Sequence, residues 1–120
     1  MSKQILIVDD SRTMRQQLVL EQKGYNVLEA DNGAVGVEVA RNNDASLIIA
    51  DVHMPVMDGL AMIAEVRQLP NHTSTPIFML TTDSRDSAMA QAKGSGATAW
   101  IIKPFNPDKL MRGVEMVLNR

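Results

Sequence analysis

The chain contains no cysteine among its 120 residues, so disulfide bonds and thiolate metal sites are excluded. Its net charge of −2 gives no electrostatic basis for a nucleic-acid partner. No apolar run approaches the roughly 20 residues of a membrane-spanning helix. The N-terminus also reaches Asp9 and Asp10 before a signal-type apolar stretch could form. We therefore expect a cytoplasmic protein that binds neither membranes nor nucleic acids.

What the sequence does contain is an alternation of short apolar runs with longer helical patterns. The length fits one domain over residues 1–120, and the hydrophobic fraction of 45% is an ordinary globular value. Runs rich in Val, Ile and Leu that alternate with helices indicate an α/β fold with a parallel sheet buried on both faces. The predicted strands are Gln4–Val8, Tyr25–Ala30, Ser46–Ala50, Pro76–Leu80 and Ala99–Ile102. The predicted helices are Arg12–Lys23, Ala34–Asn42, Leu60–Leu69, Ser84–Lys93 and one that begins at Asn106-Pro107.

Four of these strands end at side chains that can carry chemistry: Asp9, Asp10, Asp51, Thr81 and Lys103. The carboxyl ends of neighbouring parallel strands converge on one crevice, so we expect these side chains to share a site. Three carboxylates and one ammonium give it a formal charge of about −2, which one divalent cation would neutralise. Mg²⁺ is a hard cation that favours oxygen ligands, so a site of this kind suits it.

The motifs around these residues resemble a response-regulator receiver domain. They are VDDS at 8–11, the D-V-H-M-P-x-M-D-G loop at 51–59, the strand-end threonine at 81 and K-P-F at 103–105. The segment from Lys93 to Leu110 is similar to free-standing, CheY-like chemotaxis regulators. The resemblance covers essentially the whole chain. It implies a flavodoxin-like (βα)5 doubly wound sheet with strand order 2-1-3-4-5, and a cis Lys103-Pro104 bond.

The resemblance also implies roles for the strand-end residues. A carboxylate is a competent nucleophile toward phosphorus, and Asp51 is the expected phosphoacceptor. Asp10, Asp51 and the backbone carbonyl of His53 would hold Mg²⁺, with Asp9 acting through water or from the second shell. Lys103 would offset the phosphoryl charge. The Thr81 hydroxyl, with backbone N–H groups of residues 53 and 82, would donate to phosphoryl oxygens.

The implied function is a phosphorylation-dependent switch. A histidine kinase, expected to be of the chemotaxis type, would supply the phosphoryl group. The domain itself would catalyse the transfer and slowly hydrolyse the product, without being a conventional enzyme. Movement of Thr81 and repacking of Trp100 would alter the face formed by helix 4, strand 5 and helix 5. We expect a monomer that binds the flagellar switch protein or another downstream protein, with a possible phosphatase partner. A phosphate sink for a shared kinase is the alternative.

Three residues flank the expected phosphoryl entrance: His53, Thr82 and Asp83. Thr82 would narrow the access of phosphodonors and water, and His53 could approach Asp83 over the crevice. The alternative is that the side chains of His53 and Asp83 are simply solvated. Elsewhere, His72 is expected to be a solvated turn residue. The first helix is two residues shorter than in the relatives it resembles, which predicts an early end or a distortion near Leu20–Gln22.

Two other classes of protein share parts of this pattern. Haloacid-dehalogenase-type phosphatases use an aspartate nucleophile, Mg²⁺, a strand-end threonine and a lysine, but they need D-x-D after the first strand. This chain has adjacent Asp9 and Asp10 instead. Flavodoxin-type electron carriers share the sheet topology, but they need a hydroxyl- and glycine-rich phosphate loop at this place. The two carboxylates would repel such a phosphate. Both alternatives are therefore disfavoured.

Overall fold

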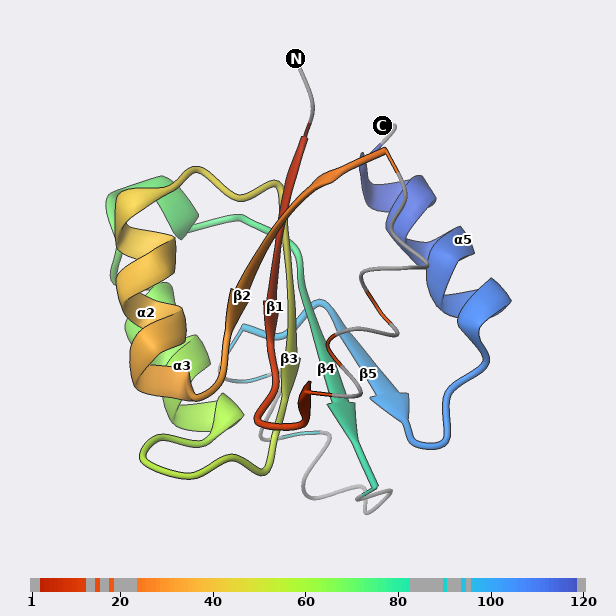
Figure 1. The fold of residues 1–120 in the computed structure, drawn as a ribbon. Helices are drawn as coiled ribbons and strands as arrows, with labels where there is room; N and C mark the ends of the chain where they lie inside the picture. The colour runs from red at the N-terminus through yellow and green to blue at the C-terminus, as the bar shows by residue number, and fades with distance from the viewer. Residues whose placement is uncertain are drawn as a thin grey trace.

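A computed structural model of the protein describes residues 3–12, 15, 18, 24–82, 90, 94 and 96–118. Five parallel strands form one sheet in the order β2-β1-β3-β4-β5, as predicted (Figure 1). The strands are β1 (Gln4–Val8), β2 (Asn26–Ala30), β3 (Leu47–Asp51), β4 (Ile77–Thr81) and β5 (Ala99–Ile102). All of their carboxyl ends therefore lie at one edge of the sheet, at the bottom of Figure 1.

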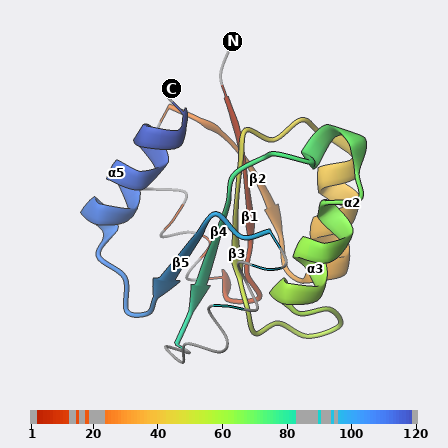
Figure 2. The same ribbon diagram turned by 180° about the vertical axis from the view of Figure 1, so that it is seen from behind.

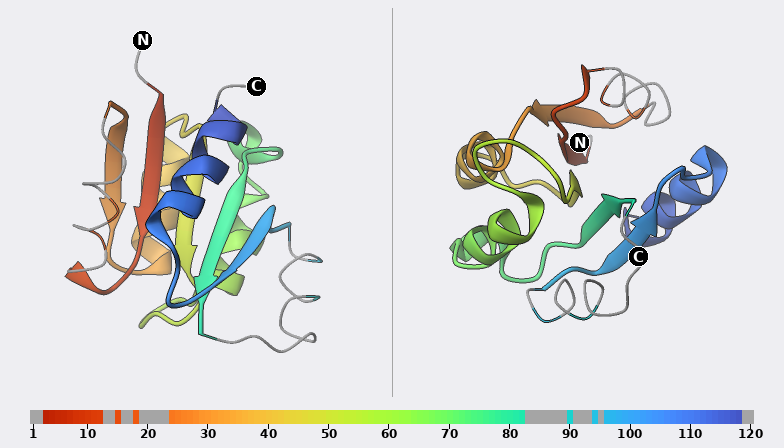
Figure 3. Two further views of the ribbon diagram at one scale, coloured as in Figure 1. Left: turned by 90° about the vertical axis from the view of Figure 1, so that its right-hand side faces the viewer. Right: turned by 90° about the horizontal axis from the view of Figure 1, so that it is seen from below.

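Helices cover both faces of the sheet. Figures 1 and 2 show α2 (Gly33–Asn42) and α3 (Gly59–Val66) together on one face and α5 (Pro107–Leu118) on the other. The end-on view in Figure 3 shows the sheet between these two layers. Helix α2 contacts β1 and β2 as well as α3. The described helices therefore pack against the faces of the sheet and not against its carboxyl edge.

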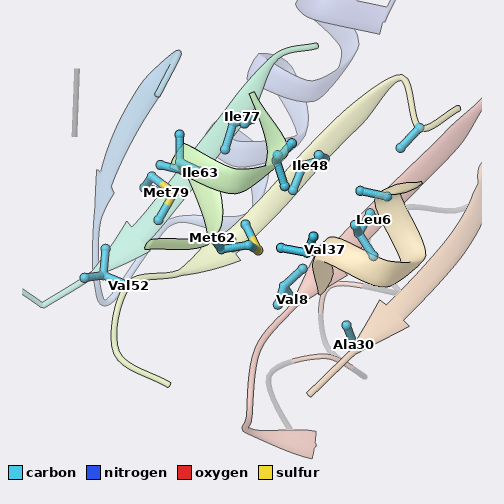
Figure 4. Packing of buried hydrophobic residues seen from close by; sticks show 14 residues of the cluster. Leu6, Val8, Ala30, Val37, Ile48, Val52, Met62, Ile63, Ile77 and Met79 are labelled. Carbon is cyan, nitrogen blue, oxygen red and sulfur yellow. The ribbon is translucent and has the colours of Figure 1, made fainter. Parts of the chain in front are cut away.

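Each face of the sheet has its own apolar core, because successive strand residues point to opposite faces. In β1, Leu6 and Val8 belong to the core under α2 and α3, whereas Ile5 and Ile7 belong to the core under α5. All four are fully buried. Figure 4 shows the first core, where Val8 lies near side chains from both helices. A strand buried on both faces explains the continuous apolar runs in the sequence.

The helix starts follow the capping residues in the sequence. The Asn32 side chain accepts from the amide of Val35 at 3.0 Å, and the Asp58 side chain accepts from the amide of Ala61 at 2.8 Å. Side-chain oxygens of this kind satisfy N–H groups that have no partner within the helix. The predicted start of the last helix at Asn106-Pro107 is confirmed, since the Asn106 side chain accepts from the amide of Asp108 at 2.9 Å.

One sequence prediction is wrong: His72 is not a solvated turn residue but is completely buried, at 0% exposure. It lies in a short 3₁₀ helix, η1 (Pro70–His72), after α3. Its Nε2 lies 2.8 Å from the carbonyl of Ala40 and 2.9 Å from that of Asn43, at the end of α2. Because carbonyls only accept, Nε2 carries the proton and donates to them, and Nδ1 lies 2.8 Å from the Thr75 hydroxyl oxygen. The imidazole thus caps the C-terminus of α2 from a distant segment.

Two further predictions lie outside the described residues. In the predicted first helix, Arg12, Arg15 and Leu18 are described and helical, and the segment expected to be distorted, Leu20–Gln22, is not described. Most of the predicted helix Ser84–Lys93 is also outside the described part of the chain. Over the described residues, no helix has the length and apolar character needed to cross a membrane.

Candidate functional site at the carboxyl edge of the sheet

The strand register brings the predicted site residues to one level of the sheet. Val8 pairs with Ala50, so the next residues, Asp9 and Asp51, lie side by side. Asp51 is the last residue of β3 and pairs with Leu80, which precedes Thr81. Thr81 in turn pairs with Ile102, which precedes Lys103. Four strands therefore bring their carboxyl ends together at the same edge of the sheet.

Three carboxylates form an acidic cluster there. Oxygens of Asp9, Asp10 and Asp51 all lie within 4.8 Å of one another. Asp9 and Asp51 are buried, at 2% and 7% exposure, and Asp10 is exposed. Buried carboxylates at this spacing repel one another unless a cation or a proton compensates them.

The effect of placing carboxylates together in a buried site is clearest in the pKa of Asp9. Burial raises the pKa of its carboxyl group, and the charges of Asp51 and Asp10 raise it further. The backbone N–H of Ser11, which donates to Asp9 Oδ1 at 2.8 Å, and the charge of Lys103 lower the pKa and only partly offset the increase. Oδ2 of Asp9 is buried and accepts no hydrogen bond from the described residues.

Lys103 brings a positive charge into the cluster from the segment after β5. Its Nζ lies 3.2 Å from Asp51 Oδ2 and 3.8 Å from Asp9 Oδ2. Its backbone N–H donates to the carbonyl of Thr81 at 2.7 Å, which ties the segment to β4. The following Lys103-Pro104 bond is cis, as expected. One ammonium against three carboxylates leaves the cluster negative.

The residues expected to report or control phosphorylation occupy different environments. Thr81 is fully buried, whereas Thr82 and His53, which each follow a strand end, are exposed. Trp100 is half-buried and packs against the core under α2 and α3. Asp83 lies outside the described residues, so the predicted approach to His53 stays a prediction.

The loop after β3 completes the site. The backbone N–H of His53 lies 3.4 Å from Asp51 Oδ1. Gly59, at the start of α3, allows the loop to close tightly, because a Cβ there would lie 2.3 Å from the carbonyl oxygen of Asp51. The D-G pair at 58 and 59 thus has two tasks, since Asp58 caps α3 and Gly59 packs against the strand end.

Arg15 is a site neighbour that the sequence reasoning missed. Its guanidinium donates to the carbonyl of Asp9 and forms an ion pair with Glu29 of β2, at 3.2 Å. The only sign in the sequence was the position of Arg15 in the first turn of a predicted helix, three to four residues after the helix start. This position would place its side chain near the strand ends. Arg15 fixes the backbone at which the acidic pair begins.

The cluster fits a divalent cation on two observations. Its donor atoms are all carboxylate oxygens, which Mg²⁺ prefers, and it contains a buried oxygen with no hydrogen bond from the described residues.

Residues 5–115 match the response regulator receiver domain family. The chain belongs to this family. Receiver domains are phosphoryl-accepting switches that bind Mg²⁺ at such an acidic site, and neither a phosphatase nor a flavodoxin assignment is needed.

Several relatives of this receiver domain are chemotaxis or putative response regulators. The chemotaxis protein CheY4 of Vibrio cholerae is 37% identical, with a TM-score of 0.91 over 98% of this chain and 99% of that one. A putative response regulator from Chloroflexus aurantiacus is 34% identical, with a TM-score of 0.91 over the whole of both chains.

Other relatives carry different names. The transcriptional regulatory protein SrrA of Staphylococcus aureus is 35% identical over 122 residues. The chain spans about half the length of this relative, at 49%. The receiver domain of a sensor histidine kinase from Pseudomonas aeruginosa has the same fold, at 24% identity and a TM-score of 0.90, and was solved with a magnesium ion in its active site cleft.

Proposed function

We propose that Asp51 accepts a phosphoryl group from a phosphohistidine of a sensor kinase. The observation that carries this proposal is the buried Asp51 carboxylate, with Lys103 Nζ at 3.2 Å and two further carboxylates beside it. A structural ion pair alone would not need the extra negative charge of Asp9 and Asp10. An acidic site open to a cation and a phosphoryl group does need it.

In the proposed reaction, an Asp51 carboxylate oxygen attacks phosphorus as the bond between phosphorus and the donor imidazole nitrogen breaks. The imidazole leaves with the bonding electron pair, and Asp51 becomes an acyl phosphate. Lys103 then pairs with the phosphoryl oxygens in place of the carboxylate. The His53 and Thr82 amides and the Thr81 hydroxyl would donate to the same oxygens. Water attacking phosphorus would later release inorganic phosphate and restore Asp51.

Asp10, Asp51 and the backbone carbonyl of His53 are the groups that would hold Mg²⁺, and Asp9 would contact it through water or from the second shell. When bound, Mg²⁺ would neutralise charge on the carboxylates and on the phosphoryl oxygens. The protein's own residues prepare the nucleophile. The burial of Asp51 limits the contact of its carboxylate with water, and Lys103 orients that carboxylate.

Phosphorylation would bias a pre-existing equilibrium between two conformations. Thr81 is buried at the end of β4, and Trp100 lies on the neighbouring β5, where Met79 is its partner in the register. A shift of Thr81 toward the phosphoryl group would leave space that Trp100 can enter. The surface formed by β5, α5 and the segment before β5 would change as a result.

For the partner, we propose a kinase of the chemotaxis type and a downstream protein such as the flagellar switch. Support comes from the K-P-F-N-P segment at 103–107 and from the 37% identity to CheY4. A pull-down against the N-terminal peptide of a flagellar switch protein, with and without beryllofluoride, tests this. Binding only with beryllofluoride, and none by Asp51→Asn, is expected. No binding in either state would contradict the switch-binding role and favour a phosphate sink or a different output.

A further inference from the structure

The loop between β3 and α3 holds its shape under backbone strain. Its ends are closed by a hydrogen bond from the Gly59 amide to the carbonyl of Val52, at 2.8 Å. Within it, the Met57 amide donates to the carbonyl of Pro55 at 2.7 Å, and Val56 between them has a φ of 69°. This is the strained form of the γ-turn, with a central φ of about +75°. A β-branched residue seldom adopts a positive φ, and such conformations cost about 1–3 kcal/mol.

Nothing in the local sequence favours a positive φ at Val56. Its side chain is 83% exposed, so burial of an apolar group does not compensate the strain. A strained residue persists only when the surrounding structure determines its position. The restraint must therefore come from contacts that other loop residues make.

Gly33, the first residue of α2, makes the contact that holds the loop. Its amide donates to the carbonyl of Met57 at 3.1 Å. A Cβ at Gly33 would lie 2.4 Å from that carbonyl oxygen and 3.0 Å from the carbonyl carbon. Both obstacles are backbone atoms, which cannot rotate away as a side chain can. Only glycine allows α2 to approach the loop this closely.

We infer that Gly33 is a positioning residue for the metal and phosphoryl site, acting through Met57 on the backbone of His53. The inference rests on the proposed role of His53 as a carbonyl ligand. Six residues separate Val52 from Gly59, and two of them cannot absorb a displacement easily. Pro55 has a locked φ and Val56 is already strained. A shift of the Met57 carbonyl is therefore transmitted to the other end of the loop, which begins at His53.

Two alanine substitutions in the same helix separate this role from a general effect on α2. Gly33→Ala must displace the backbone of Met57. Gly36→Ala, one turn later, meets only side-chain atoms, with Met62 Sδ at 3.0 Å and Val8 Cγ2 at 3.1 Å. Isothermal titration of the folded variants with Mg²⁺ should show about tenfold weaker binding for Gly33→Ala. A loss of this size is typical when a residue that supports a metal ligand, without touching the metal, is replaced. Gly36→Ala should stay close to the wild type.

A rescue substitution tests the path through the loop. Val56→Gly removes the strain and lets the turn absorb the displacement, so the double variant Gly33→Ala/Val56→Gly should regain most of the lost Mg²⁺ affinity. A merely structural role of Gly33 would not be rescued at an exposed loop position. Equal Mg²⁺ affinity for Gly33→Ala and Gly36→Ala, or no rescue, would overturn the inference. Failure of the wild type to bind Mg²⁺ would instead overturn the proposed function.

Hydrogen exchange in the wild type provides a test that needs no variant, should Gly33→Ala fail to fold. Coupling between two sites is reciprocal, so Mg²⁺ should strengthen the contact that favours its binding. Exchange of the Gly33 amide should slow when Mg²⁺ is added. The Gly36 amide, which donates to the carbonyl of the N-cap residue Asn32 at 2.9 Å, serves as the internal reference. Equal changes at both amides would contradict the coupling.

Discussion

Lys103 and Asp51 are 52 residues apart in the chain, and their side chains meet at 3.2 Å across the carboxyl edge of the sheet. The same ammonium lies 3.8 Å from Asp9, so one cation serves two buried carboxylates. Its removal has two opposite consequences, because it compensates negative charge but also competes with a bound cation.

We predict that Lys103→Met weakens phosphorylation and strengthens metal binding. Phosphorylation by acetyl phosphate should slow at least about tenfold, because the developing phosphoryl charge loses its counter-ion. Mg²⁺ should bind more tightly, since the cluster becomes more negative. Rate measurements with acetyl phosphate and Mg²⁺ titrations check the two effects. Weaker Mg²⁺ binding in Lys103→Met would show that Lys103 organises the metal site rather than opposing its charge.

Magnesium should raise the thermal midpoint of the wild-type protein. A ligand bound only by the folded state stabilises it by about 2.7 kcal/mol at a hundredfold excess over Kd. Asp10→Asn removes a carboxylate ligand, so the Mg²⁺-dependent shift should largely disappear. Asp44→Asn, an exposed carboxylate outside the acidic cluster, is the matched control and should keep the shift. Thermal scans with and without Mg²⁺ measure both, and an unchanged shift in Asp10→Asn would exclude it as a ligand.

His72→Leu should destabilise the protein by about 2–4 kcal/mol, because the carbonyls of Ala40 and Asn43 lose a buried donor. Asn71 also donates to both carbonyls, which limits the loss. His53→Leu replaces an exposed histidine and serves as the control. Denaturant unfolding of both variants without metal measures the difference. Equal midpoints would mean that the cap contributes nothing to stability.

The rim of the crevice should control access to Asp51. We predict that Thr82→Ala speeds phosphorylation by acetyl phosphate, because a smaller side chain opens the entrance. His53→Ala and Asp83→Ala should change dephosphorylation non-additively if the two side chains form a gate, since paired groups couple. An exposed pair of this kind is worth at most about 1 kcal/mol. Additive effects in the double-mutant cycle would remove the gate and leave Thr82 as the access control.

The site was predictable from the sequence because its chemistry follows the strand ends directly. In a parallel sheet, the residue that ends an apolar run lies at the carboxyl edge, whatever its distance in the chain. The placement of Asp51, Thr81 and Lys103 at one site could therefore be predicted from local patterns alone. The strand bounds shifted by a residue, so that Asp51 and Thr81 end their strands instead of following them.

The contacts that the sequence did not reveal join segments with no local sign of each other. Asn71-His72-Thr73-Ser74 looks like an exposed turn, and its partner is the end of α2 about 30 residues earlier. The one available signal was that α2 lacks a glycine stop, so its last carbonyls needed donors from elsewhere. The sequence did not predict the close approach of Gly33 to Met57, because it depends on how α2 packs against a distant loop.

The most direct test of the account is the chemical location of the phosphoryl group. The wild-type protein, phosphorylated with Mg²⁺ by a phosphohistidine kinase, can be reduced with borohydride, which converts an aspartyl phosphate to homoserine. Peptide mass mapping should place homoserine at position 51, and Asp51→Asn should accept no phosphoryl group. Homoserine at position 9 or 10, or an acyl phosphate that persists in Asp51→Asn, would contradict the assignment of Asp51 as the phosphoacceptor.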